Sequence, residues 1–299
     1  MRRSEQGYQL ALFEMTPPTE HVVNVASVPQ RSPFRYPGGK TWLVPRIRQW
    51  LASLPWKPSV FLEPFSGGAI VGLTVASERL AEKVVLVELD EQVAAVWSTI
   101  LSDDHEWLAE RILSFDMTIE NLRAELAHKA TSVKRVAFQT ILRNRTYHGG
   151  IMAPGSSLIR HGENGRGIKS RWYPATIARR IRAIASIHDR IEFVRGDGIE
   201  AIRSYARFAK TAMFVDPPYT VAGKRAGTRL YKYFQLNHER LFAEASKTKG
   251  DMLLTYDNAP EVAELAARHG FDIRTVAMKN THHATMTELL IGRNLQWLK

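Results

Sequence analysis

Short apolar runs alternate along most of the chain with longer stretches of helical periodicity. Residues 60–62 and 84–87 are apolar runs of strand length, and residues 69–80 between them suit a buried helix. The alternation resumes later, and further strands are predicted at residues 191–194, 211–215, 252–256, 271–277 and 288–291. Near-continuous apolar strands separated by helices indicate an α/β fold with a mostly parallel sheet covered on both faces.

Further helices follow from periodicity and from end signals. Residues 93–113 have the pattern of one long helix, and Asn237 is the expected N-cap of a helix that runs to residue 245. Other helices are predicted to start near residue 133, at Pro174 and at Pro260. Residues 1–30 show no period and hold three prolines, so a flexible N-terminal arm is predicted there.

A long polar segment interrupts this alternation. Residues 144–169 are rich in glycine and lie between two predicted helices, which is unusual in a compact domain and typical of a functional insertion. We therefore predict an inserted domain of helices and loops at residues 126–185. The main domain is then formed by residues 31–125 together with 186–299.

The basic charge of the chain is concentrated in the same segment. The 299 residues carry 41 Lys and Arg against 30 Asp and Glu, a formal charge of +11. Twelve of the basic residues and only one acid, Glu163, lie between residues 129 and 182, so the remainder is balanced. A charge confined to one segment indicates binding to a polyanion, although a solvated helix face is the alternative.

Other features of the composition narrow the chemistry. The chain has no cysteine, which excludes disulfides, cysteine zinc sites and a cysteine-dependent methylation of cytosine C5. His282 and His283 lack a third ligand at a suitable spacing, so no metal is expected. No apolar run reaches the ~18 residues of a membrane helix, and residues 1–14 lack a secretory signal. A cytoplasmic protein without a membrane partner is expected.

Acidic residues follow several of the predicted strands. Glu63, Glu88 and Asp216 stand at strand ends, and Asp197 comes just after another strand. Ligands of open α/β sheets bind at this edge, so the four acids predict a site for a polar, partly cationic ligand. An acid placed like Glu88 accepts hydrogen bonds from ribose hydroxyls in Rossmann-like units, and an exposed charge is the alternative.

Two turns contain paired glycines. Gly67 and Gly68 follow the first strand, but the dinucleotide pattern G-x-G-x-x-G is absent. Gly38, Gly39 and Lys40 resemble the end of a Walker A loop. Phe34 stands where that loop needs its first glycine, and no strand precedes it, so the sequence does not predict a nucleotide-hydrolysing site.

The tetrapeptide Asp216-Pro217-Pro218-Tyr219 is the sharpest chemical signal. Its two prolines remove two amide donors and fix the backbone, which leaves carbonyl oxygens free to accept hydrogen bonds. A carboxylate, the Pro217 carbonyl and an aromatic ring at a strand end suit the exocyclic amino group of a flat base. A simple turn is the alternative.

Together these segments resemble the alpha group of DNA adenine-N6 methyltransferases, the family of the bacterial DNA adenine methylases. The resemblance spans residues 33–292 and includes the late strands at 255–258 and 288–291. Its main segments are Tyr36-Pro37-Gly38-Gly39-Lys40, Glu63-Pro64-Phe65-Ser66-Gly67-Gly68, Asn144-Arg145 with Gly150, and Asp216-Pro217-Pro218-Tyr219. The resemblance implies a Rossmann-like class I methyltransferase sheet with an inserted target-recognition domain, acting on a flipped adenine of double-stranded DNA.

The resemblance also implies S-adenosylmethionine as the methyl donor and assigns residues to roles. The implied cofactor contacts are Tyr36, Lys40, Glu63, Phe65, Gly67, Glu88, Asp197 and Asp216. The implied catalytic residues are Asp216, Pro217, Pro218 and Tyr219. The candidate DNA contacts in the basic segment are Arg143, Asn144, Arg145, Tyr147, His148, Arg166, Lys169 and Arg171. Glu88 departs from the family, in which aspartate is usual at this place.

Three alternatives remain open at this point. The acceptor could be N4 of cytosine or an amino group of RNA, although cytosine-N4 enzymes more often have serine in place of Asp216. The chain could also be a catalytically degenerate module that only binds nucleic acid. A restriction endonuclease is a further candidate partner, as in restriction–modification.

Overall fold

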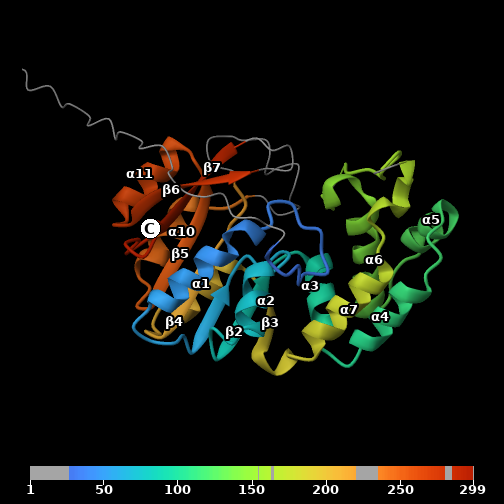
Figure 1. Ribbon diagram of the computed structural model, residues 1–299, viewed down its shortest axis with the longest axis horizontal. Helices are drawn as coiled ribbons and strands as arrows, with labels where there is room; N and C mark the ends of the chain where they lie inside the picture. Colours follow the sequence, from blue (N-terminus) through green and yellow to red (C-terminus); the bar gives the residue numbers. More distant parts are fainter. Residues whose placement is uncertain (1–26, 154, 163–164, 220–234, 280–284, 299) are drawn as a thin grey trace, which may run out of the picture.

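The computed structural model describes residues 27–153, 155–162, 165–219, 235–279 and 285–298. Its centre is a seven-stranded sheet in the order β3-β2-β1-β4-β5-β7-β6 (Figure 1). The strands are β1 (Val60–Glu63), β2 (Lys83–Glu88), β3 (Ile191–Arg195), β4 (Thr211–Val215), β5 (Asp251–Asp257), β6 (Asp272–Lys279) and β7 (Thr285–Gly292). Strands β1 to β5 are parallel, whereas β7 lies antiparallel between β5 and β6. The predicted Rossmann-like α/β sheet is confirmed.

Helices cover both faces of this sheet. They are α1 (Val44–Ser53), α2 (Ile70–Ser77), α3 (Glu91–Ile100), α4 (His105–Ser114), α5 (Ile119–Ala127), α6 (Val133–Thr146), α7 (Pro174–Ala185), α8 (Gly198–Tyr205), α10 (His238–Ser246) and α11 (Pro260–Arg268). Helices α1, α5 and α8 were not predicted by the apolar pattern. The N-cap predicted at Asn237 is confirmed, because its side chain accepts the N–H of Arg240.

Successive side chains of each strand point to opposite faces of the sheet, and so the core consists of two clusters, one on each face. Phe61, Leu86 and Phe214 face the cluster that contains α1, α2 and α3. Their neighbours Leu62 and Val215 face the other cluster, with α8, α10 and α11. The strands therefore bury side chains on both faces, which explains why they read as continuous apolar runs rather than alternating ones.

The long helix predicted at residues 93–113 is wrong, because the structure contains two helices there. Helix α3 ends at Ile100, and α4 begins at His105. The polar residues between them, Ser102, Asp103 and Asp104, favour a turn. The helical pattern crosses that turn because both helices bury apolar side chains in the same core cluster.

Four helices form a lobe at one end of the sheet (Figure 1). We call α4 to α7, together with the described residues of the segment 147–173 between α6 and α7, the helical lobe. Helix α4 packs against α7, and α6 packs against α3, so the lobe shares one core with the sheet. The predicted insertion supplies α6 and α7, whereas α4 and most of α5 precede residue 126.

The N-terminal arm was predicted for residues 1–30. Residues 1–26 lie outside the described residues, and Val28 is buried against the core cluster. Separately, none of the helices in the described ranges is long and apolar enough to cross a membrane.

Candidate active site

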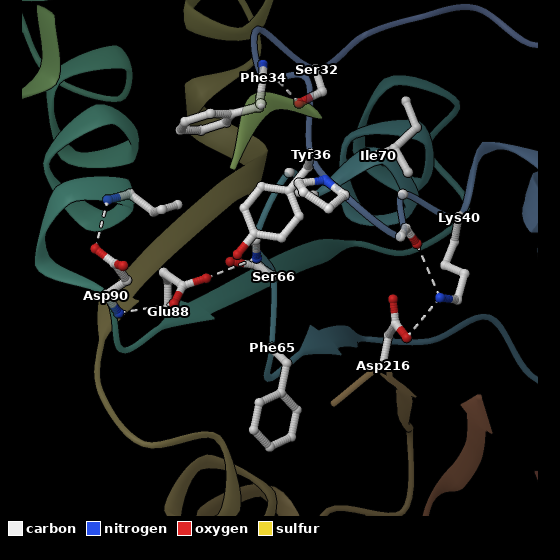
Figure 2. A pocket seen from close by; sticks show the side chains of 18 of the residues that line it. Ser32, Phe34, Tyr36, Lys40, Phe65, Ser66, Ile70, Glu88, Asp90 and Asp216 are labelled. Atoms are coloured by element: carbon white, nitrogen blue, oxygen red, sulfur yellow. Dashed lines mark hydrogen bonds and ion pairs between the residues drawn. The ribbon is translucent and has the colours of Figure 1, made fainter. Parts of the chain in front are cut away.

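A cavity of about 930 Å³ lies at the carboxyl ends of β1, β2 and β4. The segment before α1, the turn after β1 and part of the helical lobe complete its wall. All four acids singled out at strand ends line it, namely Glu63, Glu88, Asp197 and Asp216. Figure 2 shows Glu88 and Asp216 on opposite sides of Tyr36. The volume is within the range of pockets that enclose a small organic ligand.

Asp216 follows β4 and carries three hydrogen-bonding contacts on one oxygen. Its Oδ1 accepts from the hydroxyl of Tyr219 at 2.7 Å and from the hydroxyl of Thr255 at 2.9 Å. The Lys40 ammonium lies 3.0 Å from the same oxygen (Figure 2). These contacts fix the carboxylate, and none of the hydrogen bonds found among the described residues uses Oδ2. Thr255 was missed as a site residue because a threonine in a buried strand has no separate sequence signal.

The other members of the tetrapeptide have different surroundings. Pro218 lines the cavity, and Pro217 is buried. The Tyr219 ring stacks on Tyr256 with 5.6 Å between centroids, and it lies 4.9 Å from the Lys40 Nζ. Burial and the charge of Asp216 raise the pKa of Tyr219 well above its usual value, so its hydroxyl stays a donor. In this structure the Tyr219 hydroxyl orients Asp216, and its ring stacks on Tyr256.

Lys40 is a buried cation between two acidic side chains. The side chain is only 3% exposed, and its Nζ donates to the Gly38 carbonyl at 3.0 Å. Beside Asp216, it lies 3.6 Å from Oε2 of Glu288 on β7. Lys40 lines the cavity, as predicted for a cofactor contact, but its ammonium is directed at these protein oxygens. Glu288 was not predicted as a site residue.

Glu63 ends β1 beneath the cavity. Its Oε2 accepts the backbone N–H of Gly72 in α2 at 2.7 Å. Burial raises the pKa of Glu63 well above its ordinary range, although the bond from Gly72 acts in the opposite direction. The side chain joins strand to helix and lines the cavity.

Glu88 ends β2 and holds the glycine turn. Its Oε2 accepts from the N–H of Gly67 at 2.9 Å, and Oε1 accepts from the N–H of Asp90 at 2.9 Å. Burial, with a contribution from the charge of Asp90, raises the pKa of Glu88 to about 7. The turn is held from its other side by Trp97, whose Nε1 donates to the Gly67 carbonyl at 3.0 Å. Sequence reasoning missed Trp97 because it occupies an ordinary apolar helix position.

The glycine turn packs directly on Tyr36. Gly67 has φ of +44°, and a Cβ there would lie 2.6 Å from a Tyr36 ring carbon. A Cβ at Gly68 would lie 2.8 Å from the Tyr36 Cβ. Glycine is therefore required here by both conformation and space. Phe65 lines the cavity beside this turn, and Asp197 caps α8 by accepting the N–H of Ile199.

The sequence of the whole region from Tyr36 to beyond the tetrapeptide has a family match. Residues 36–281 match the model of the D12 class N6 adenine-specific DNA methyltransferases. The chain belongs to this family. No curated protein matches the sequence significantly.

Comparison with solved structures gives weak matches, which include proteins described as methyltransferases. A Pyrococcus horikoshii protein described as a "putative RNA methyltransferase" is 10% identical with a TM-score of 0.38, and the match covers 87% of this chain and 83% of that one. The M1A22 tRNA methyltransferase of B. subtilis is 12% identical with a TM-score of 0.37, covering 83% and 64%. A precorrin-6y methyltransferase of Geobacter metallireducens is 7% identical with a TM-score of 0.33, covering 82% and 84%.

In this methyltransferase, Asn144 has a structural position. Its side chain is fully buried at the end of α6, where Oδ1 accepts the N–H of Arg35 at 2.8 Å. Its Nδ2 donates to the carbonyls of Arg35 and Gly150, both at 3.0 Å. This arrangement does not agree with the predicted base contact by Asn144. Its side-chain oxygen and nitrogen already form hydrogen bonds to the backbone, and the side chain is shielded from solvent. Gly150 has φ of +75° and packs on the Arg35 carbonyl. The spacing of Asn144 and Gly150 in the sequence therefore follows from their shared contact with the backbone of Arg35.

Arg145 is also more buried than expected for a base contact. Its side chain is 7% exposed and donates to the Pro33 carbonyl, and it lines the cavity wall. Arg171 lines the cavity too. The other predicted DNA contacts lie outside the residues that line it: Arg143 and Tyr147 are half-buried, whereas His148, Arg166 and Lys169 are exposed on the lobe.

Metal ligation finds no support in the described ranges, which contain no group of three His, Asp or Glu side chains suited to a metal. His282 and His283 lie outside the described residues.

Proposed function

We propose that this methyltransferase transfers a methyl group from S-adenosylmethionine to N6 of an adenine flipped out of DNA. The observation that carries the proposal is Asp216, whose Oδ1 is held by three donors while the residue lines the cavity. A carboxylate fixed in this way presents Oδ2 as a preorganised acceptor. Membership of the D12 family supports adenine as the target.

The cavity has the chemistry to hold S-adenosylmethionine. Glu88 lies at the end of β2, where an acid accepts hydrogen bonds from ribose hydroxyls, and glutamate reaches as aspartate does in the usual pattern. Gly67 lets the backbone of the turn pack closely on Tyr36, and both residues line the cavity. Tyr36, Phe65 and Asp197 complete the wall. When bound, the donor supplies an electrophilic methyl group on a positively charged sulfur.

Asp216 makes the target nitrogen a better nucleophile. The N6 lone pair of adenine is delocalised into the ring, which weakens it. An N–H of N6 donating to Asp216 favours a more tetrahedral nitrogen, whose lone pair can then point at the methyl group. The tetrapeptide thus lowers the barrier by alignment and by a fixed negative charge. The proton that leaves N6 is taken up at the Asp216 carboxylate.

An arginine cluster beside the cavity supports a polyanionic substrate. Arg35, Arg145, Arg171 and Arg180 line one wall, and they come from four separate segments. Burial, together with the charges of its neighbours, lowers the pKa of Arg145 to about 10. No salt bridge between described residues involves Arg35, Arg145 or Arg180. DNA phosphates would supply the counter-charge.

Some of the basic charge counted in the sequence serves the fold instead. Lys134 pairs with Asp104, and Arg135 pairs with Glu125. Arg182 pairs with Glu106 and Glu110 on α4. These acids precede the basic segment, so at least three of its twelve basic residues are neutralised within the protein.

The test is transfer of labelled methyl groups to DNA by the full-length protein, followed by nucleoside analysis. We expect N6-methyladenine from wild type. D216N keeps the side-chain shape but removes the charge, and we expect at least a ~100-fold loss of the methyl-transfer rate. S-adenosylhomocysteine, which lacks the positive charge on sulfur, should still bind to D216N within about threefold of the wild-type Kd. D272N, at an exposed carboxylate that starts β6, is the matched control.

The same experiment separates the alternatives. If the product were N4-methylcytosine, or if only RNA were methylated, the acceptor would not be adenine in DNA. DNA binding without any affinity for S-adenosylmethionine would identify a binding module. Full activity of D216N would remove Asp216 from the mechanism.

A further inference from the structure

Strand β7 brings a second carboxyl group, that of Glu288, close to Lys40 and Asp216. Because β7 lies between β5 and β6, Glu288 pairs in register with Asp257 and with Val276. The residue is 8% exposed and lines the cavity. Its neighbours Leu289, Leu290 and Ile291 are packed in the core, so the strand holds Glu288 in place.

We propose that Glu288 is a positioning residue that sets the effective charge of Asp216 through Lys40, and so makes the site select a positively charged methyl donor. This inference rests on the proposed function, since it concerns the same donor. It adds a residue that is 72 positions away from Asp216 in the chain and belongs to a different strand.

The geometry makes Lys40 a shared cation. Its Nζ lies 3.0 Å from the Gly38 carbonyl, 3.0 Å from Asp216 Oδ1 and 3.6 Å from Glu288 Oε2. That oxygen of Glu288 is buried and has no hydrogen-bond partner among the described residues, so the nearby Lys40 ammonium is the cation that stabilises its charge there. With both carboxyl groups ionised, the trio carries one net negative charge. With Glu288 protonated, it is neutral.

The two charge states have different consequences for Asp216. An ionised Glu288 draws part of the Lys40 charge to itself, and Asp216 keeps its negative charge for the ligand. A protonated Glu288 leaves Lys40 to neutralise Asp216 alone. The first state stabilises a cationic sulfur in the cavity, whereas the second does not.

The switch between these states falls near neutral pH. Burial raises the pKa of Glu288 to about 7, with Asp216 and Asp257 acting in the same direction and Lys40 against them. Among the described residues, the charged groups that act on Glu288 are Lys40 before α1, Asp216 after β4 and Asp257 at the end of β5. The ionised state therefore prevails above pH about 7.

The experiment measures the Kd of S-adenosylmethionine and of its demethylated product, S-adenosylhomocysteine, by calorimetry from pH 6 to 8.5. The two ligands differ only in the methyl group and the positive charge on sulfur. Their ratio therefore cancels effects on the shared ribose, including those of Glu88. For the wild type we expect the preference for the cationic donor to rise about tenfold over this range. A ratio that is flat with pH would overturn the proposal.

The variant E288Q removes the charge with little change in shape. We expect its preference for S-adenosylmethionine to stay, from pH 6 to 8.5, at the low value that the wild type has at pH 6. Its Kd for S-adenosylhomocysteine should equal that of the wild type at each pH. E288D retains a carboxylate and should restore a pH-dependent ratio. E261Q, at an exposed site on α11, is the control. A wild-type ratio in E288Q would overturn the proposal while leaving the proposed function intact. Loss of donor binding in the wild type itself would instead overturn the proposed function.

Discussion

Glu88 uses both carboxylate oxygens on backbone N–H groups before any ligand is bound. Its pKa of about 7 stands well above the ordinary value of 4.5. Between these pH values the folded protein holds a proton that the unfolded chain has lost. The contribution of Glu88 to stability is therefore present below pH 4.5 and is lost as the pH rises to about 7.

Ligand binding should show the opposite trend with pH. Ribose hydroxyls donate best to an ionised carboxylate, so we expect the affinity for both S-adenosylmethionine and S-adenosylhomocysteine to rise as the pH passes about 7. E88Q should bind both about tenfold more weakly at pH 8 and should lose this pH dependence. Calorimetry on both ligands checks it. An effect on only one ligand would argue against a ribose contact.

At the scale of elements, the joint between β1 and α2 depends on one glycine. A Cβ at Gly72 would lie 2.5 Å from Glu63 Oε2 and 2.5 Å from Leu86 Cδ2. Alanine is favoured over glycine inside a helix by up to ~1 kcal/mol. The close approach of the strand is expected to outweigh that preference.

We predict that G72A lowers the free energy of unfolding by about 1–3 kcal/mol. G196A is the matched control, because a Cβ there meets its nearest atoms at 3.7 Å and 3.9 Å, ordinary contact distances. Denaturant unfolding of both variants provides the comparison. A G72A protein as stable as wild type would mean that β1 and α2 can separate at little cost.

The strands were predictable from the sequence because burial on both faces makes each an uninterrupted apolar run. The acids of the cavity were predictable for a related reason, since parallel strands bring their carboxyl ends to one edge. The pair of Lys40 and Glu288 was not predictable, because it depends on where β7 enters the sheet. The burial of Asn144 was likewise hidden, because an asparagine beside arginines looks the same whether it faces a base or a backbone.

For the whole molecule, the contrast between arginines that line the cavity and arginines that pair with acids determines how it should meet DNA. Arg180 on α7 lines the cavity and lowers the pKa of Arg145 through its charge. Arg182, two residues further along the same helix, pairs with Glu106 and Glu110. The two residues therefore share a helix, and among the described residues only Arg182 has an acidic partner.

We expect R180Q to weaken DNA binding and to reduce the slope of log K against log salt concentration by about one. R182Q should leave that slope unchanged, because its charge is already neutralised within the protein. Fluorescence anisotropy over a range of salt concentrations measures both. Equal slopes for the two variants would show that the cavity wall does not contact phosphates.

The hydrogen bonds of Asn144 connect the helical lobe to the segment before α1. Its amide holds both backbone groups of Arg35, and the next residue is Tyr36, on which the glycine turn rests. A shift of the lobe on binding a duplex would thus move the Arg35 peptide and, through it, Tyr36 in the donor site. Binding of DNA would then change the affinity for the methyl donor, and binding of the donor would change the affinity for DNA by the same factor.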